Sequence, residues 1–473
     1  MMNTHTNNII PQTCKMTDNT SVGVGVQDFE PRPQLPQQQN LEPQLPKEWE
    51  VVPLDNKYIE FQNGLWKGKK EPYIKVRVLR NTNFNNDGTI DFEDVAELNV
   101  EQRNFKNREI IKDDIILERS GGGPTQPVGR VVFFEREDQF MYSFSNFTSR
   151  IRINDKLIIF PKFLFYFLLD FYYQGKTNDI QNRTTGIRNL DFSRYKQIPI
   201  PLPPLPEQQK IAAVLSAVQE AKEKTEAVIA AAKALKKSMM KHLFTYGPVS
   251  PQEAENVPLK ETEIGPVPEE WRVERLGKIA DKFLGGGTPS TQKKEYWDGD
   301  IEWTTSKRID NNNGIYLWSG EKKITKIGLK NSSTHLIPKD NLIIGTRVGV
   351  GKVAINKVDI AISQDLTGAF IDKNKYNLEF LAYRISNNDV QQIFLGCTRG
   401  TTIKGIPRDD LEKIQIGCPP LPTQQKIASI LSTIDAKIEA EENKKKALEE
   451  LFKSLLHNLM TAKIRVNQLE ISS

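Results

Sequence analysis

The sequence predicts a mixed α/β protein in which two α/β domains are joined by two long helices that pair as a coiled coil. The motif Pro-Pro-Leu-Pro-Glu-Gln-Gln-Lys-Ile-Ala at 203–212 returns as Pro-Pro-Leu-Pro-Thr-Gln-Gln-Lys-Ile-Ala at 419–428. Each copy precedes about 40 residues rich in Ala, Glu, Lys and Leu without Gly or Pro, which favours helix. A repeat at 216 residues is too long for a solenoid unit of about 20 to 50 residues. The chain therefore contains a duplicated domain.

The two helices are expected at 204–246 and 420–463. In each, the proline pair enforces an extended start, and the next proline suits a first helical turn. Gly247 and Pro248 should end the first helix. Apolar positions step by three and four, which predicts a heptad seam between the helices. The expected seam residues are Ile211, Leu215, Val218, Ile229, Met239, Leu243, Ile427, Leu431, Ile434, Ile438, Leu448, Phe452, Leu455 and Leu459.

The middle of this seam is polar, with Lys222 and Thr225 in one helix and Glu441 and Lys445 in the other. About 40 residues of helix span about 60 Å, longer than an ordinary globular helix. This length favours a coiled coil between the two copies. The alternative is two ordinary amphipathic helices packed on a globular core.

Composition limits the class of protein. The chain has 473 residues, enough for two or three domains, and 38% of them are apolar. No apolar run approaches the roughly 20 residues of a membrane span. Three widely spaced cysteines form neither a disulfide framework nor a metal site, so we expect a reducing cytoplasm. A net charge of +5 permits a nucleic-acid partner without establishing one.

The helices divide the chain into units. Residues 1–45 form a Pro/Gln-rich tail that we expect to be disordered. Residues 46–203 and 268–419 are the two α/β domains, which open with Pro-Lys-Glu-Trp-Glu-Val and Pro-Glu-Glu-Trp-Arg-Val. A linker at 247–267 and a C-terminal tail at 464–473 complete the chain. The frames of the two domains match and their middles do not, which predicts two different targets.

Sequence motifs give no support for catalysis or for a metal site. The turn at 345–352 is similar to a phosphate-binding loop, but Thr346 replaces a required glycine and Val353 replaces the hydroxyl residue after the lysine. The adenine-methylating motif Asn-Pro-Pro-aromatic is absent, and we find no Ser-His-Asp signature. We therefore expect a binding subunit with no catalytic residues.

Arginine and lysine beside small residues at turns are the best candidates for binding DNA. Small residues let the backbone approach a phosphate, and the cation neutralises it. A solvated charged surface is the alternative. The candidates are Arg119, Arg130, Arg183, Thr184, Thr185, Arg188, Thr288, Ser306, Lys307, Arg308, Arg347, Lys352, Arg399, Thr401, Thr402 and Lys404.

A resemblance to a known family rests on the two helix openings, on Trp49 and Trp271, and on the Gly-Gly-Gly-Thr-Pro-Ser loop at 285–290. With these features the sequence closely resembles the specificity subunit of type I restriction-modification systems. The resemblance implies two target-recognition domains that each read half of a split, asymmetric site in double-stranded DNA. It implies antiparallel helices that set the distance between the domains and dock two modification subunits. In the first domain, Gln62-Asn63-Gly64 stands where the family has its first glycine loop.

The same resemblance assigns the chemistry to partners. The modification subunits would carry S-adenosylmethionine, and the restriction subunits would use ATP and Mg²⁺ to translocate and cut DNA. This chain would hold no cofactor. The alternative from another class is a non-catalytic coiled-coil scaffold with two protein-binding domains.

Overall fold

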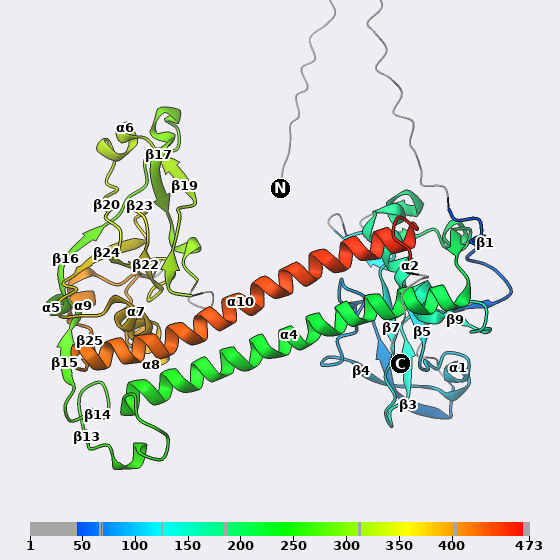
Figure 1. The fold of residues 1–473 in the computed structure, drawn as a ribbon, viewed down its shortest axis with the longest axis horizontal. Coiled ribbons are helices and arrows are strands. Elements are labelled where there is room, and N and C mark those ends of the chain that lie inside the picture. Colours follow the sequence, from blue (N-terminus) through cyan, green and yellow to red (C-terminus); the bar gives the residue numbers. More distant parts are fainter. Residues whose placement is uncertain are drawn as a thin grey trace, which may run out of the picture. The chain divides into compact units, whose positions relative to one another are not determined.

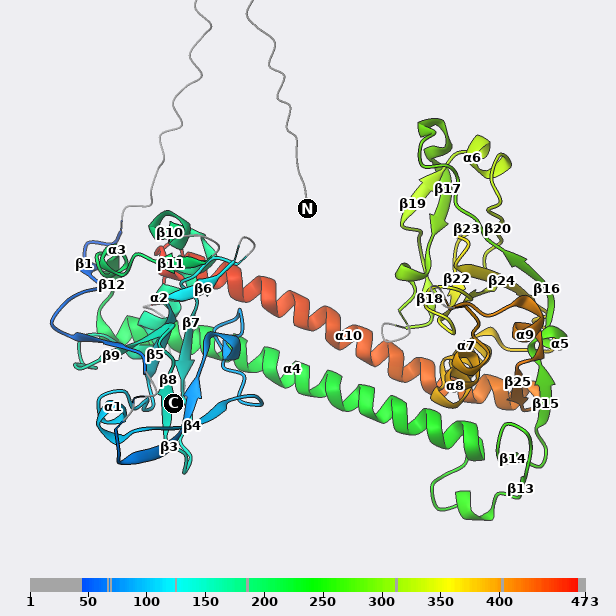
Figure 2. The ribbon, with the colours of Figure 1, turned by 180° about the vertical axis from the view of Figure 1, so that it is seen from behind.

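Figures 1 and 2 show the computed structural model. The structure describes residues 45–466 except 66, 67, 69, 124, 125, 184–186, 311–313 and 401–403. The tail expected at 1–45 therefore lies outside the described residues, apart from Leu45. The same holds for four candidate threonines, Thr184, Thr185, Thr401 and Thr402.

Two long helices, α4 (Leu205–Tyr246) and α10 (Leu421–Met460), lie side by side along their length (Figures 1 and 2). Each follows a proline in an extended conformation, as the motif predicts. Ion pairs join Lys233 to Glu442 at 2.7 Å and Lys236 to Asp435 at 2.6 Å. A third joins Glu226 to Lys445 at 2.8 Å. Along these three ion pairs the residue number rises in α4 while it falls in α10, so the two helices are antiparallel. This arrangement confirms the predicted fold class.

The seam between α4 and α10 is apolar toward its ends and polar near its middle. Lys222, Thr225 and Glu441 are buried there, as the sequence indicates. At the far end of α10 the fully buried residue is Leu456, while the predicted Leu455 is only half-buried. This end of α10 also packs on α2, so the buried face turns to meet two neighbours. The other predicted seam residues are buried or half-buried.

The first domain holds a four-stranded antiparallel sheet and a three-stranded sheet. The four-stranded sheet has the order β2 (Ile59–Asn63), β9 (Thr148–Ile153), β5 (Asp114–Glu118), β7 (Val131–Phe134). The three-stranded sheet has the order β4 (Ala96–Glu101), β3 (Tyr73–Leu79), β8 (Tyr142–Phe144). The remaining elements are β1 (Glu50–Pro53), η1 (Asn81–Asn83), α1 (Gln102–Lys106), β6 (Ser120–Gly122), α2 (Pro161–Tyr173), η2 (Lys176–Ile180), β10 (Gln181–Arg183), β11 (Arg188–Leu190), α3 (Phe192–Lys196) and β12 (Pro199–Leu202).

The second domain repeats this plan. Its first sheet has the order β16 (Ala280–Gly285), β24 (Leu366–Ile371), β21 (Leu342–Gly345), β22 (Val353–Asn356), β18 (Tyr316–Leu317). Its second has the order β19 (Lys322–Ile324), β17 (Trp297–Thr304), β23 (Ile360–Ile362), β20 (Leu336–Ile337). The remaining elements are η3 (Ala254–Asn256), β13 (Leu259–Lys260), β14 (Val267–Pro268), β15 (Arg272–Arg275), α5 (Leu276–Ile279), η4 (Lys294–Tyr296), η5 (Ser306–Arg308), α6 (Lys326–Lys330), α7 (Leu378–Ser386), α8 (Asn388–Gly396), α9 (Arg408–Lys413) and β25 (Gln415–Cys418).

Strand pairing shows the duplication directly. The order β2-β9-β5-β7 recurs as β16-β24-β21-β22. The parallel pair β3/β8 recurs as β17/β23, and the closing pair β1/β12 as β15/β25. The core of the first domain includes Leu215 of α4 and Leu459 of α10, whereas the core of the second includes Leu243 and Leu431. Each domain is thus packed on the start of one long helix and the end of the other.

Three charged residues and a tryptophan form a hydrogen-bonded cluster in the first domain, next to the end of α10. We call this cluster, Glu48, Trp49, Glu207 and Arg465, the terminal clamp. Arg465 donates to Glu207 at 2.5 and 2.8 Å and to Glu48 at 2.8 Å. The Trp49 indole also donates to Glu207, at 3.1 Å. Val466 is buried in the domain core. The described part of the expected C-terminal tail is therefore packed into the first domain.

None of the described helices is long and apolar enough to cross a membrane.

Candidate nucleic-acid interface

Loops from distant parts of the sequence meet in the second domain, and hydrogen bonds connect them. Thr288, after β16, donates from its hydroxyl to Gln364 at 2.5 Å. The backbone N–H of Thr346 donates to the Asp365 carbonyl at 2.8 Å. The β23–β24 loop therefore links the glycine loop at 286–290 to the β21–β22 turn.

Two further loops join the same group. The Lys352 ammonium, at the end of the β21–β22 turn, donates to the Ser306 carbonyl in η5 at 3.3 Å. The backbone N–H of Ile406 donates to the Thr346 carbonyl at 2.8 Å, which brings the loop before α9 alongside the turn. We call these five loops the second-domain loop cluster, whose described residues are 286–290, 305–308, 346–352, 363–365, 398–400 and 404–406.

Glycine gives the β21–β22 turn its shape. Gly349 and Gly351 have φ of 70° and 84°, values that favour glycine. A Cβ on Gly345 would lie 2.1 Å from the Gly349 carbonyl oxygen, so only glycine fits there. The turn closes through hydrogen bonds within it, including Gly351 N–H to the Gly345 carbonyl at 2.9 Å. It therefore presents the intervening side chains from a fixed backbone.

This loop cluster carries exposed cations. Lys307, Arg308, Arg347, Arg399 and Lys404 are exposed, whereas Lys352 is half-buried and Ser306 is buried. Arg399 forms an ion pair with Asp410 at 2.6 Å, and Arg308 contacts the Ser319 hydroxyl at 3.4 Å. Within the described part of the chain, the Arg347 side chain has neither an ion pair nor a hydrogen bond. It is available to an anionic or hydrogen-bonding partner.

Two of these cations, Lys307 and Arg308, line an open cavity of about 810 Å³. Lys322 and Val348 line it and were not among the sequence candidates. Lys322 reaches it because β19 pairs with β17, with Lys322 opposite Trp303, and no local pattern reveals that pairing. Glu321 and Asp365 also line the cavity, so both signs of charge face it.

In the first domain, the loops equivalent to the second-domain loop cluster have a different arrangement of side chains. Arg119, after β5, donates to the Asn63 side chain at 2.5 Å and lies over the Phe192 ring at 4.1 Å. Burial lowers the pKa of the Arg119 guanidinium. Arg188 lies in β11 opposite Gly122 of β6, and Arg183 lies in β10. The structure therefore brings Arg119 and the β10–β11 hairpin together, through the backbone bond from Leu190 to the Arg119 carbonyl at 2.8 Å.

Arg130 departs from what the sequence indicates, because it is only 8% exposed. Its guanidinium makes two hydrogen bonds to Glu118, at 2.8 and 2.9 Å. It also donates to the backbone carbonyls of Phe84 at 2.8 Å and Asn81 at 3.0 Å. A buried, multiply bonded arginine holds strands together, so we leave Arg130 out of the proposed DNA surface.

Gly64 and Gly286 occupy the same place in the two domains. Each donates its backbone N–H at 3.1 Å, Gly64 to Thr148 in β9 and Gly286 to Leu366 in β24. A Cβ on Gly64 would lie 1.8 Å from a carbonyl oxygen, and one on Gly286 would lie 2.2 Å from another. The segment 62–64 therefore fills the position of the glycine loop despite its weak sequence match.

The fold and the loops define a duplicated binding protein with two α/β domains on one helix pair. The sequence model of the type I restriction modification DNA specificity domain matches residues 46–232 and 268–450, and the chain belongs to this family.

Similar proteins extend over most of the chain. A putative type I restriction enzyme MjaX specificity subunit of Methanocaldococcus jannaschii is 28% identical over 89% of this chain and 95% of its own length. The EcoR124I/EcoR124II specificity subunit of Escherichia coli is 30% identical over 51% of this chain and 56% of its own. The S subunit structure from M. genitalium aligns with a TM-score of 0.54 at 15% identity, covering 89% of this chain and 97% of that one. That structural likeness shows the fold alone.

Proposed function

We propose that this chain is the DNA-specificity subunit of a type I restriction-modification complex, with each domain reading one half of a bipartite site in double-stranded DNA. The observation that carries the proposal is the repeated plan: two domains of the same strand order place loop clusters at equivalent positions on one helix pair. Two such readers on a common helix pair suit two neighbouring major grooves, which recur about every 34 Å. The family membership supports the same function.

The two domains would contribute differently to binding. The second-domain loop cluster offers exposed lysine and arginine for phosphates and for guanine edges. In the equivalent loops of the first domain, Arg119 already donates a hydrogen bond to the Asn63 side chain. The Ser120 hydroxyl there donates to the side-chain oxygen of Asn189. We infer that the second domain supplies more of the salt-dependent affinity.

Catalysis belongs, in this proposal, to partner subunits in the cytoplasm. Modification subunits would bring S-adenosylmethionine and transfer the methyl group to adenine. Restriction subunits would bring ATP and Mg²⁺. Among the described residues no group of three or more His, Cys, Asp or Glu is placed to hold a metal ion.

DNA binding by the isolated chain should weaken steeply with salt, and Arg347→Ala or Lys307→Ala should each reduce the slope of log K against log[salt] by about one. Each removes an exposed cation from the second-domain loop cluster. Fluorescence anisotropy on a site-bearing duplex measures the slope. Lys241→Ala, an exposed lysine on α4, is the matched control and should leave the slope unchanged. A flat salt dependence of the unmodified chain would favour the protein scaffold instead.

A further inference from the structure

Two loops that correspond by the duplication have the same backbone hydrogen bonds. They are the β8–β9 loop, residues 145–147, and the β23–β24 loop, residues 363–365. In each, the first residue is a serine whose carbonyl accepts from the N–H three residues later, at 2.9 Å in the first domain and 3.0 Å in the second. The serine N–H donates to the carbonyl of Leu79 in the first domain and of Thr304 in the second, at 2.9 Å in both. The two loops are therefore held in the same way.

The last residues of these loops, Phe147 and Asp365, occupy equivalent positions. The Phe147 carbonyl accepts hydrogen bonds from the first two residues after β5, at 2.8 and 3.2 Å. The Asp365 carbonyl accepts from the first two residues after β21, at 2.8 and 3.3 Å. Those neighbours include Arg119 and Arg347, so both positions lie within the loops proposed to face DNA. The two side chains therefore leave equivalent, well-anchored backbones.

The two side chains are chemically different. The Phe147 ring is 44% exposed and pairs with no other aromatic ring among the residues that the structure describes. Asp365 is half-buried and lines the open cavity in the second-domain loop cluster. Its carboxylate makes neither an ion pair nor a hydrogen bond within the described part of the chain. Single exposed apolar residues are common, whereas a half-buried carboxylate without a partner is not.

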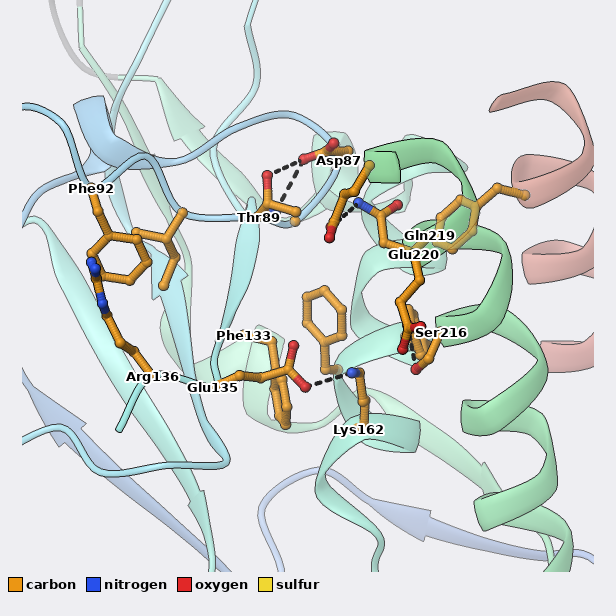
Figure 3. A pocket seen from close by; sticks show the side chains of 16 residues that line it. Asp87, Thr89, Phe92, Phe133, Glu135, Arg136, Lys162, Ser216, Gln219 and Glu220 are labelled. Carbon is orange, nitrogen blue, oxygen red and sulfur yellow. Dashed lines mark hydrogen bonds and ion pairs between the residues drawn. The ribbon is translucent and has the colours of Figure 1, made fainter. Parts of the chain in front are cut away.

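Carboxylates at another cavity show the usual situation. A cavity of about 440 Å³ lies between α4, α2 and the β3–β4 loop (Figure 3). Each of the four carboxylates that line it has an ion pair or a side-chain hydrogen bond. The pairs are Glu135–Lys162, Asp87–Lys222, Glu220–Lys224 and Glu223–Gln219. Glu321, which lines the same cavity as Asp365, accepts from the Thr305 hydroxyl at 2.5 Å. Asp365 therefore lacks the partner that these other carboxylates have.

The chemistry of each side chain points to a base edge rather than to a phosphate. A carboxylate is repelled by phosphates, and in the major groove it accepts a hydrogen bond from the N4 amino group of cytosine. A phenylalanine ring has no charge to offer a phosphate, and it packs against the 5-methyl group of thymine. Because both backbones are fixed in advance, binding orders little besides the side chains themselves.

We propose that 147 and 365 are the equivalent specificity-determining positions of the two domains. Phe147 packs against the methyl group of a thymine in the half-site of the first domain. The Asp365 carboxylate accepts a hydrogen bond from the amino group of a cytosine in the half-site of the second. The duplication kept the loop and changed this side chain, so the same position in each domain selects a different base. The inference rests on the proposed function and adds the chemical groups that each domain recognises.

The test of Asp365 uses the complex of this chain with its modification subunits and measures binding to a set of duplexes by fluorescence anisotropy. Sequencing of methylated DNA supplies the parent site, and exchange of residues 46–203 shows which half belongs to the second domain. Replacement of one C·G pair in that half should weaken binding of the unaltered complex about tenfold. Asp365→Ala should bind the parent site about tenfold more weakly and lose nothing further from that replacement. Asp365→Asn, which keeps the size of the side chain, should lose the same preference for C·G.

The test of Phe147 replaces each thymine of the first half-site in turn by deoxyuridine, which lacks only the 5-methyl group. One replacement should weaken binding of the unaltered complex about fourfold, the factor that burial of one methyl group provides. The same replacement should have no effect on Phe147→Ala, because the ring that contacts the methyl group is gone.

Two variants outside the loops are the matched controls. Phe140→Ala removes a ring that is 42% exposed just before β8, at the opposite end of that strand from Phe147. Asp281→Asn removes an exposed carboxylate of β16. Both should bind every duplex as the unaltered complex does. The Phe147 and Asp365 variants should each keep the discrimination of the other half-site, which shows that the complex is folded.

The proposal requires both results. It is overturned if Phe147→Ala keeps the full response to deoxyuridine, or if no deoxyuridine weakens binding of the unaltered complex. It is equally overturned if the Asp365 variants discriminate every C·G pair of the second half-site as the unaltered complex does. In these cases the complex still binds a bipartite site and the proposed function stands. An unaltered complex that binds no specific site would instead overturn the proposed function.

Discussion

Arg465→Ala is expected to destabilise the first domain by about 3–5 kcal/mol, the usual cost of leaving a buried charge without its partner. Glu207 is only 4% exposed, and Arg465 supplies two of its hydrogen bonds. The hydrogen bond to Glu207 also raises the pKa of the Arg465 guanidinium. Urea unfolding followed by the fluorescence of the six tryptophans measures the loss, and Trp49 belongs to the terminal clamp.

The second domain offers the matched control. Thr423 and Val249 stand where the duplication places Glu207 and Arg465, so the equivalent ion pair cannot form there. Thr423→Ala should change stability by less than about 0.5 kcal/mol. The variant with both Arg465→Met and Glu207→Leu should recover much of the loss, since it leaves no unpaired charge. A loss below about 1 kcal/mol for Arg465→Ala would mean that Glu207 is adequately solvated without its partner.

Seven residues inserted in both long helices, after Ala227 and after Asn443, should lengthen the spacer of the DNA site by about three base pairs. Seven helical residues add about 10 Å and nearly two full turns, and three base pairs span about the same length. The two positions face each other, because Glu226 pairs with Lys445 on one side and Lys233 with Glu442 on the other. Sequencing of methylated DNA from cells with the variant and its partner subunits measures the spacer.

The control inserts the same residues in α4 alone. That change moves Lys233 and Lys236 away from their acidic partners on α10 and should lower stability and activity. The half-sites should stay the same in every active variant, since no loop has changed within its domain. A double-insertion variant that is fully active with an unaltered spacer would show that the helices do not set the distance.

The helices could be predicted because their signals are local. Proline placement, helix propensity and the heptad step lie within a few residues of one another, and the observed bounds of α4 and α10 follow them closely. The duplication made the pairing of the two helices predictable as well. The choice between Leu455 and Leu456 could not be predicted, because it depends on α2 as a third packing partner.

The candidate site was only partly readable from the sequence. Exposed cations such as Arg347 and Lys404 lie at glycine turns, where composition suggests them. Arg130 has the same local character yet is buried, because β5 and β7 pair and bring Glu118 to it. Lys322 depends on strand pairing in the same way. The terminal clamp joins residues 258 positions apart, beyond the reach of any local pattern.

Exchange of residues 46–203 for the corresponding domain of a relative, followed by sequencing of methylated DNA in cells with the modification subunit, tests the central claim most directly. The account predicts a bipartite methylated site in which one half changes while the other half and the spacer are kept. The reason is that each domain has its own sheets and loop cluster, and the helix pair is retained. Simultaneous change of both halves, or a site without two parts, would contradict independent reading by two domains.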